Sequence, residues 1–212
     1  MSGAGVIAFD LDGTLVDSVE GIHASLVAAC QALGLEAPSQ ERLRCHIGPP
    51  LSQYLPRLLK LEQHHAESLV QQVVQQFRHH HDREGWRLYS LYEGVPELLE
   101  QLTEAGWSLH VVSHKPFPLA EQLLKQEGLD LRFASLQAPG SHGWRNKSTA
   151  LKHLMRQETM PPSHWYVGDT ASDHEAATQA SFSFAAADYG YGLCAQADAR
   201  ITAPSQLLEV LR

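Results

Sequence analysis

Two acidic residues near the start of the chain could act together in one site. Asp10 and Asp12 lie in the run FDLDGTL, directly after the apolar run VIAF. Such a short apolar run predicts a buried strand, and the two carboxylates point the same way if the strand continues through them. Adjacent carboxylates repel each other unless a cation binds or one of them carries a proton. The pair therefore indicates metal binding or acid–base chemistry, with a solvated turn as the plain alternative.

A second acidic pair follows a later apolar run. Asp169 and Asp173 lie in the run VGDTASD, so Asp169 is expected at the end of a strand and Asp173 about one helical turn further on. An aspartate at a helix start is often only a cap, and that is the favoured role for Asp173 taken alone. Together with Asp10 and Asp12, however, the carboxylates predict a hard oxygen-ligand site for Mg²⁺.

Two further segments could bind a phosphate group. Ser113 and His114 follow the run that ends in Val111-Val112, and a hydroxyl with the backbone amides after it can hold phosphate oxygens. A serine after a strand is also a common turn residue. Lys147 lies at the start of a predicted helix, where a lysine is normally solvated. Because a cation is electrostatically unfavourable at a helix start, its placement gives weak support for an anionic partner.

The elements that must position these residues alternate along the chain. Short apolar runs predict strands at residues 6–9, 108–112, 164–167 and 182–186, and helical patterns lie at residues 95–105, 118–127, 147–156 and 172–180. This alternation predicts βαβ units and a parallel sheet that is covered on both faces. Ligands of such sheets bind at the carboxyl ends of the strands. The candidate residues are therefore expected at one edge of the sheet.

One long stretch breaks the alternation. From about residue 17 to residue 88 the chain shows helical patterns, at 19–33 and 63–81, and no convincing strand. We predict an α-helical domain at 17–88, inserted into a core of residues 1–16 and 89–212. The histidines of this stretch are expected at a solvated helix end rather than around a metal ion, because consecutive helical residues point in different directions. These histidines are His64, His65, His79, His80 and His81.

Composition narrows the classes of function. The chain has 212 residues, of which 43% are hydrophobic and 19% charged, and its net charge is −8. Its basic residues are scattered, which argues against a nucleic-acid-binding face, and no window is long and apolar enough for a membrane span. The three widely spaced cysteines suit a reducing compartment. We expect a cytoplasmic monomer or homodimer that binds neither nucleic acid nor membrane.

The order of the motifs resembles the haloacid dehalogenase superfamily. The run DLDGTL, a serine after a later strand, a lysine and the run GDTxxD look like its four motifs, and the helical stretch looks like its C1-type cap. Within the superfamily, IGPPL at residues 47–51 and YGYG at residues 189–192 resemble phosphoglycolate phosphatase and its relatives. The resemblance implies an α/β fold with a Rossmann-like parallel sheet, and a phosphatase acting on a small phosphorylated metabolite.

The resemblance also implies a role for each acidic residue. Asp10 would attack phosphorus and form an aspartyl-phosphate, and Asp12 would protonate the leaving oxygen and then deprotonate the attacking water. Mg²⁺ would be held by Asp10, the backbone carbonyl of Asp12 and Asp169, with Asp173 close by or acting through water. The acid at Asp12 favours phosphate chemistry, because dehalogenases of the superfamily lack it.

The resemblance implies that the remaining candidates bind the phosphoryl group or contact the rest of the substrate. Ser113 and Lys147 would bind phosphoryl oxygens, and His114 stands where relatives often carry Asn, so contacts beside the phosphate can differ. The cap candidates for substrate specificity are Arg44, His46 and Gly48. Pyrophosphatase, 5′-nucleotidase and a β-phosphoglucomutase-like enzyme remain alternatives with the same motifs, as does a regulatory or binding protein of this fold.

Overall fold

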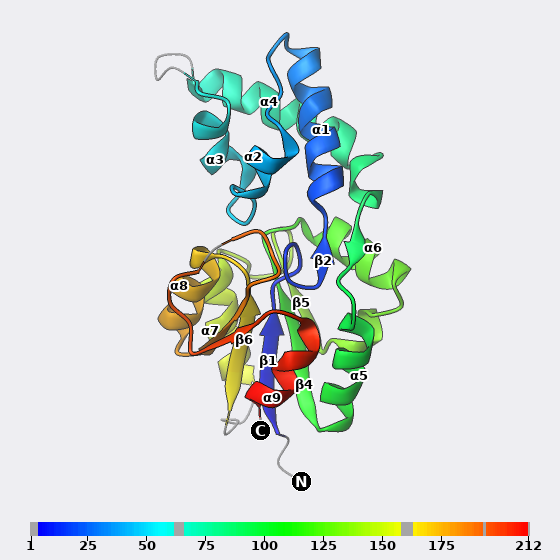
Figure 1. The fold of residues 1–212 in the computed structure, drawn as a ribbon, viewed down its shortest axis with the longest axis vertical. Helices are drawn as coiled ribbons and strands as arrows, with labels where there is room; N and C mark the ends of the chain where they lie inside the picture. The colour runs from blue at the N-terminus through cyan, green and yellow to red at the C-terminus, as the bar shows by residue number, and fades with distance from the viewer. Residues whose placement is uncertain (1–3, 62–65, 158–162, 193, 212) are drawn as a thin grey trace. The chain divides into compact units, whose positions relative to one another are not determined.

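The computed structural model describes residues 4–61, 66–157, 163–192 and 194–211. These residues divide into two compact units, one formed by Met1–Val16 with Leu91–Arg212 and the other by Asp17–Ser90. The chain passes between the units at β2 (Val16–Asp17) and β3 (Ser90–Leu91), two short strands that pair with each other (Figure 1). None of the described helices is both long and apolar enough to cross a membrane.

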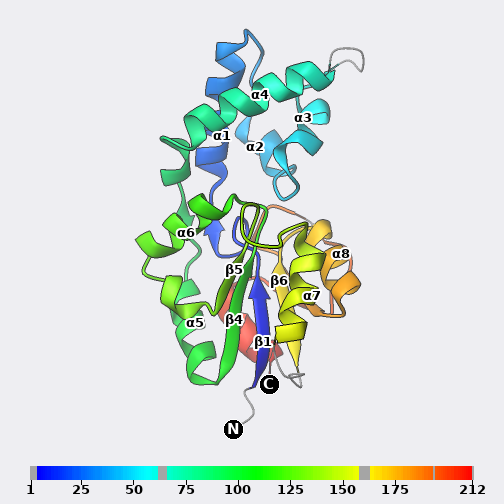
Figure 2. The same ribbon diagram turned by 180° about the vertical axis from the view of Figure 1, so that it is seen from behind.

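The larger unit is built on a parallel sheet of six strands in the order β5-β4-β1-β6-β7-β8 (Figure 2). The strands are β1 (Gly5–Phe9), β4 (Trp107–Val112), β5 (Ser135–Gln137), β6 (His164–Gly168), β7 (Ser183–Ala187) and β8 (Ala199–Ile201). All five residues of β1 are buried, as expected for a central strand of a covered parallel sheet. Phe9 pairs with Val111 on one side and Val167 on the other, so β1, β4 and β6 end at the same edge.

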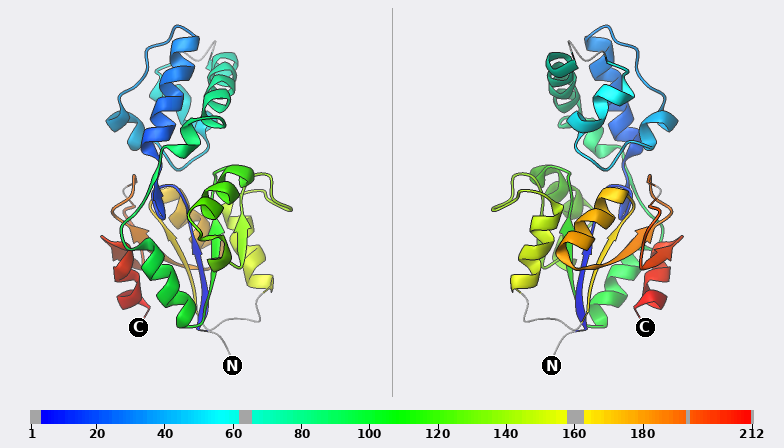
Figure 3. Two further views of the ribbon diagram at one scale, coloured as in Figure 1. Left: turned by 90° about the vertical axis from the view of Figure 1, so that its right-hand side faces the viewer. Right: turned by 90° about the vertical axis from the view of Figure 1, so that its left-hand side faces the viewer.

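Helices cover both faces of this sheet. They are α5 (Val95–Glu104), α6 (Phe117–Gln126), α7 (Lys147–Gln157), α8 (Ala171–Ala180) and the short α9 (Leu207–Val210). Figure 3 shows α5 and α9 on one side of the sheet and α7, which packs against α8, on the other. Leu151 and Leu154 of α7 pack with Ala177 of α8 against Tyr166 and Phe184 of the sheet in one apolar core. The expected α/β fold with a parallel sheet is confirmed.

Two strands of the sheet were not predicted from the sequence. β5 and β8 have only three residues each, and all three residues of β5 are half-buried. Segments this short carry too few apolar residues to show a pattern, and they exist because a neighbouring strand offers backbone partners. The predicted strands at 6–9, 108–112, 164–167 and 182–186 agree with the structure to within one residue at each end.

The smaller unit is helical apart from its share of the paired strands. It contains α1 (Val19–Ala32), α2 (Gln40–Arg44), α3 (Leu51–Leu58), α4 (Ala66–His81) and a 3₁₀ turn at Gly85–Arg87. The buried residues of α1 include Ile22, Leu26 and Ala29, which recur at helical spacing and form the face packed against α4. Residues 63–65 of the predicted 63–81 helix, including His64 and His65, lie outside the described residues.

The expectation of a solvated histidine cluster is wrong for His81. This residue is only 6% exposed, and its Nδ1 lies 3.0 Å from the hydroxyl of Ser25 on α1. The His80 ring also contacts that hydroxyl, at 3.2 Å, whereas His79 is exposed. The end of α4 packs against α1, and this tertiary contact buries a ring that local sequence predicts to be solvated.

Candidate active site

The candidate site lies where β1 and β6 end. Asp10 and Asp169 directly follow these two neighbouring strands, and the Asp10 backbone amide donates a hydrogen bond to the Val167 carbonyl at 2.8 Å. Asp10 is 2% exposed and Asp169 is 1% exposed. The expectation that these acids share one edge of the sheet therefore matches their position, and both are far more buried than turn residues usually are.

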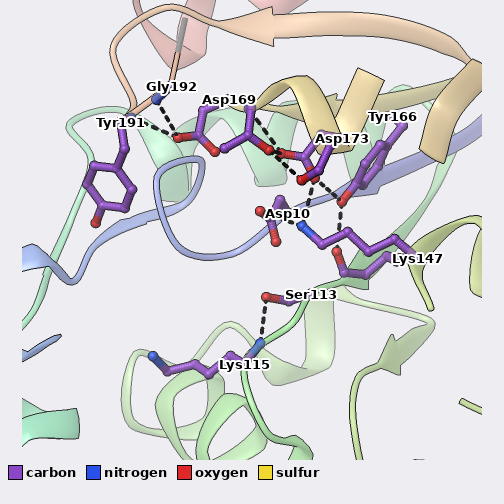
Figure 4. A network of polar contacts seen from close by, with 12 residues as sticks. Asp10, Ser113, Lys115, Lys147, Tyr166, Asp169, Asp173, Tyr191 and Gly192 are labelled. Atoms are coloured by element: carbon purple, nitrogen blue, oxygen red, sulfur yellow. Dashed lines mark hydrogen bonds and ion pairs between the residues drawn. The ribbon is translucent and has the colours of Figure 1, made fainter. Parts of the chain in front are cut away.

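Three carboxylates and one lysine form the centre of this site (Figure 4). Asp10, Asp169 and Asp173 each offer a carboxylate oxygen, and these oxygens all lie within 4.8 Å of one another. The Lys147 ammonium nitrogen is 2.8 Å from Asp10 Oδ2 and 2.7 Å from Asp173 Oδ1. Lys147 is the first residue of α7 and is only 3% exposed, so it is not the solvated lysine that is usual at a helix start.

Both carboxylate oxygens of Asp173 accept hydrogen bonds. Its Oδ2 accepts hydrogen bonds from the Thr170 amide at 3.0 Å and the Thr170 hydroxyl at 2.5 Å, which completes a capping box at the start of α8. Its Oδ1 accepts from Lys147 and lies 3.0 Å from the Tyr166 hydroxyl. Burial raises the pKa of Asp173, but the Lys147 ammonium and the Thr170 hydrogen bonds outweigh it, so the net shift is downward.

Asp169 is positioned by the loop that contains the YGYG run. Its Oδ2 accepts hydrogen bonds from the backbone amides of Tyr191 at 2.7 Å and Gly192 at 3.3 Å. Gly13 of the DLDGTL run comes close on the other side, because a Cβ added there would clash with this same oxygen. Gly13 also has a φ of +85°, which favours glycine, so the motif needs glycine for two reasons.

Lys147 alone does not balance the negative charge of these carboxylates. Burial, together with the neighbouring Asp173, raises the pKa of Asp10 to about 7 and that of Asp169 to about 8. Lys147 opposes these shifts but does not cancel them. Among the described residues, Asp10 Oδ1 and Asp169 Oδ1 are buried with no hydrogen-bond partner. Buried carboxylate oxygens without partners need a proton or a cation, so this donor set fits a hard divalent metal ion.

The residues predicted to bind phosphate lie at the same edge of the sheet. Ser113 follows the end of β4 and is 1% exposed. Its backbone amide donates a hydrogen bond to the Gln137 carbonyl at 3.0 Å. The His114 and Trp144 rings lie nearly perpendicular to each other, with their centroids 6.0 Å apart. The structure therefore holds Ser113 close to the ends of the central strands, while His114 packs against a neighbouring loop.

Two residues of this region were missed by sequence reasoning. The Lys115 ammonium nitrogen lies 3.0 Å from Asp12 Oδ1, and the Tyr166 hydroxyl contacts Asp173. Lys115 closes the run VVSHK, and Tyr166 is a buried hydroxyl-bearing residue three positions before Asp169. Both lie near predicted motifs, but only the fold shows which acid each one contacts.

The three cap candidates all have local roles in the helical unit. Arg44 forms an ion pair with Asp17 at 3.4 Å, and the His46 ring nitrogen Nδ1 lies 2.9 Å from the Arg42 carbonyl. Gly48 has a φ of +130°, a conformation that favours glycine, which explains its place in the IGPPL run. These contacts position the segment, and the side chains of Arg44 and His46 are half-buried rather than fully enclosed.

Comparisons with known proteins agree with this geometry. The family model of the haloacid dehalogenase-like hydrolases matches residues 7–187. A 5′-nucleotidase of Pseudomonas aeruginosa is 33% identical over 193 residues, which cover 88% of this chain and 83% of that protein. A phosphoglycolate phosphatase of Vibrio parahaemolyticus is 31% identical over 192 residues, covering 88% and 84%.

A solved structure extends the agreement to the whole fold. A haloacid dehalogenase-like hydrolase of Streptococcus pneumoniae superimposes with a TM-score of 0.87 at 25% identity, over 98% of both chains. The family expected from the motifs is confirmed, and so is the expected enzyme class, a phosphoric monoester hydrolase. This chain belongs to the haloacid dehalogenase-like hydrolase family.

Proposed function

We propose that this protein is a Mg²⁺-dependent phosphatase that hydrolyses a small organic phosphomonoester through an aspartyl-phosphate on Asp10. The observation that supports this most strongly is the buried group of Asp10, Asp169 and Asp173 around a single lysine. A binding protein that lacked chemistry would gain little from three buried acids, because such a group is costly to fold.

Asp10 is the nucleophile in this proposal. Lys147 holds its Oδ2, while its Oδ1 is buried without a partner among the described residues. Attack by Asp10 forms an oxygen–phosphorus bond as the ester oxygen–phosphorus bond breaks. The leaving oxygen takes a proton from Asp12, which then removes a proton from the water that hydrolyses the aspartyl-phosphate. Ser113 and Lys147 bind the phosphoryl oxygens during both steps.

Three groups would hold Mg²⁺: Asp10, Asp169 and the backbone carbonyl of Asp12. When bound, the ion supplies positive charge that favours ionised Asp10 and offsets the charge of the phosphoryl group. Asp173 already accepts from Thr170 and Lys147, so it would hold Lys147 in place and lie close to the ion or act on it through water. The cap residues Arg44 and His46 would contact the part of the substrate beyond the phosphate and so determine specificity.

The metal requirement can be tested directly. We expect steady-state phosphate release from p-nitrophenyl phosphate in the presence of Mg²⁺, and a fall to less than about one twentieth after exhaustive treatment with EDTA. Adding back Mg²⁺ should restore the rate. Full activity after chelation would contradict the metal role. A panel of metabolite phosphates that begins with phosphoglycolate and 5′-nucleotides, the substrates in the relatives' names, would then identify the substrate class.

Metal binding should also depend on pH. The folded-state pKa values of Asp10, about 7, and Asp169, about 8, lie above their ordinary value of 3.8, so the folded protein binds more protons than the unfolded chain between about pH 4 and pH 8. The metal-free protein therefore loses stability as pH rises through this window. Because metal binding requires ionised ligands, the rise in melting temperature on adding Mg²⁺ should be larger at pH 8 than at pH 5. An equal rise at both pH values would contradict this assignment.

Kinetics can distinguish cap residues that contact the substrate from residues that only stabilise the cap. Replacing Arg44 or His46 by Ala should lower kcat/KM for the best metabolite substrate by about tenfold and change that for p-nitrophenyl phosphate far less, because the aryl ester depends mainly on the core motifs. Arg42→Ala is the matched control, since Arg42 is exposed on α2, the helix that contains Arg44. Equal losses on both substrates would show that these residues only support the cap, as the Arg44–Asp17 ion pair allows.

A further inference from the structure

A second buried lysine lies beside the proposed acid and base. Lys115 is 6% exposed, and its ammonium nitrogen is 3.0 Å from Asp12 Oδ1. The two residues are 103 positions apart in the chain, so the contact depends on the fold. In Figure 4 the ammonium end of Lys115 lies apart from the group around Lys147. The proposed function gives Lys147 a role but leaves Lys115 without one.

The backbone on the Lys115 side of this contact is fixed. The amide of Ser113 donates to the Gln137 carbonyl at 3.0 Å, and the amide of Lys115 donates to the Ser113 hydroxyl at 3.2 Å (Figure 4). Two residues later, the amide of Phe117 donates to the Pro139 carbonyl at 2.8 Å as α6 begins. A side chain that is 4% exposed on such a backbone has few alternative positions for its ammonium group.

The backbone around Asp12 is fixed as well, so the orientation of its carboxyl group depends on the contacts of that group. The amides of Gly13 and Val16 donate to the carbonyls of Val16 and Leu11, at 2.8 and 3.0 Å. The terminal torsion of an aspartate side chain is soft, so its carboxyl plane takes up many angles unless a partner holds it. The charge-assisted contact with Lys115 supplies such a partner. The Asp12 side chain is 17% exposed, so it remains accessible from solvent.

We propose that Lys115 is a positioning residue for Asp12, which it orients for proton transfer to the leaving group. This inference rests on the proposed function. In the first step the ester oxygen–phosphorus bond breaks, an oxygen–phosphorus bond forms to Asp10, and the Asp12 proton moves to the departing oxygen. A misaligned carboxyl group slows this proton transfer without changing how the phosphoryl group is bound.

The leaving group of the substrate distinguishes this role from phosphate binding. Ethyl phosphate needs a proton on its leaving oxygen, whereas p-nitrophenolate leaves readily without one. We expect Lys115→Met to lower kcat/KM by about 100-fold for ethyl phosphate, the lower end of typical general-acid effects, and by much less for p-nitrophenyl phosphate. Lys125→Met is the matched control, because Lys125 lies on α6 with its side chain 57% exposed, and it should change neither value.

A double-variant cycle keeps the test independent of any folding defect in the single variant. Lys115→Met removes the Lys115 charge from beside Asp12, whereas Asp12→Asn with Lys115→Met removes both charges of this pair and should fold normally. If Lys115 acts through Asp12, adding Lys115→Met to Asp12→Asn should cost no further activity on ethyl phosphate. A multiplicative loss in the double variant would overturn the inference.

The outcomes also separate this inference from the proposed function. An active wild-type protein in which Lys115→Met lowers kcat/KM equally for both esters would overturn the positioning role alone, because a phosphate-binding lysine acts on every ester. A wild-type protein that hydrolyses neither ester with Mg²⁺ would overturn the proposed function, and the positioning role with it. The expected result is an active wild type and a loss that follows the leaving group.

Discussion

Replacing Asp10 by Asn should lower phosphate release from p-nitrophenyl phosphate by at least about a thousandfold, because removal of a nucleophile typically costs several powers of ten. The amide is a poor nucleophile and a weak metal ligand. The fold should survive the change. Burial and the neighbouring Asp173 raise the pKa of Asp10, so its ionised form is unfavourable in the metal-free protein. At pH 8 without metal, the melting temperature of the variant should therefore equal or exceed that of the wild type.

Two measurements show whether this loss comes from the missing nucleophile. Asp82→Asn is the matched control, since Asp82 is exposed in the helical unit, and its rate should equal that of the wild type. Acid-stable trapping of phosphate on the protein should label the wild type and fail to label Asp10→Asn. If the variant kept more than about a tenth of the wild-type rate, Asp10 would not be the nucleophile.

The position of the site at one sheet edge could be predicted from the sequence because topology dictates it. Asp10, Ser113 and Asp169 each follow an apolar run, and adjacent parallel strands end together, as the pairing of Phe9 with Val111 and Val167 shows. No knowledge of side-chain positions is needed for that step. The same reasoning explains why β5 and β8 were missed, since three-residue strands lack a detectable pattern.

The partners of each acid could not be predicted, because they depend on side chains from distant parts of the chain. Sequence pattern places Lys147 at a helix start, but only the packing of α7 beside α8 brings its ammonium group between Asp10 and Asp173. The contact of Lys115 with Asp12 has the same origin. For His81 the prediction itself was wrong: its polar neighbours in sequence predict a solvated ring, but packing against α1 buries it.

Replacing Lys147 by Met should remove most activity and also destabilise the metal-free protein strongly. Lys147 is the cation that two buried carboxylates share, and breaking a buried ion pair from one side typically costs about 3–5 kcal/mol. The loss should depend on pH. Lys147 opposes the rise in the pKa of Asp10, which is about 7, so without Lys147 the folded protein keeps the Asp10 proton to higher pH and loses stability over a wider range as pH rises. Urea unfolding in EDTA should therefore show a larger difference from the wild type at pH 8 than at pH 5.

Two further variants separate lost charge pairing from lost packing. Lys152→Met, exposed on the same helix α7, should change the free energy of unfolding by less than about 0.5 kcal/mol. The double variant Lys147→Met with Asp173→Asn removes one of the two uncompensated acids, so it should recover part of the lost stability while activity stays low. Mg²⁺ should also recover more stability in Lys147→Met than in the wild type, because the ion then replaces the missing cation. A Lys147→Met protein as stable as Lys152→Met at pH 8 would mean that the carboxylate group does not depend on Lys147, and the charge balance proposed for this site would be wrong.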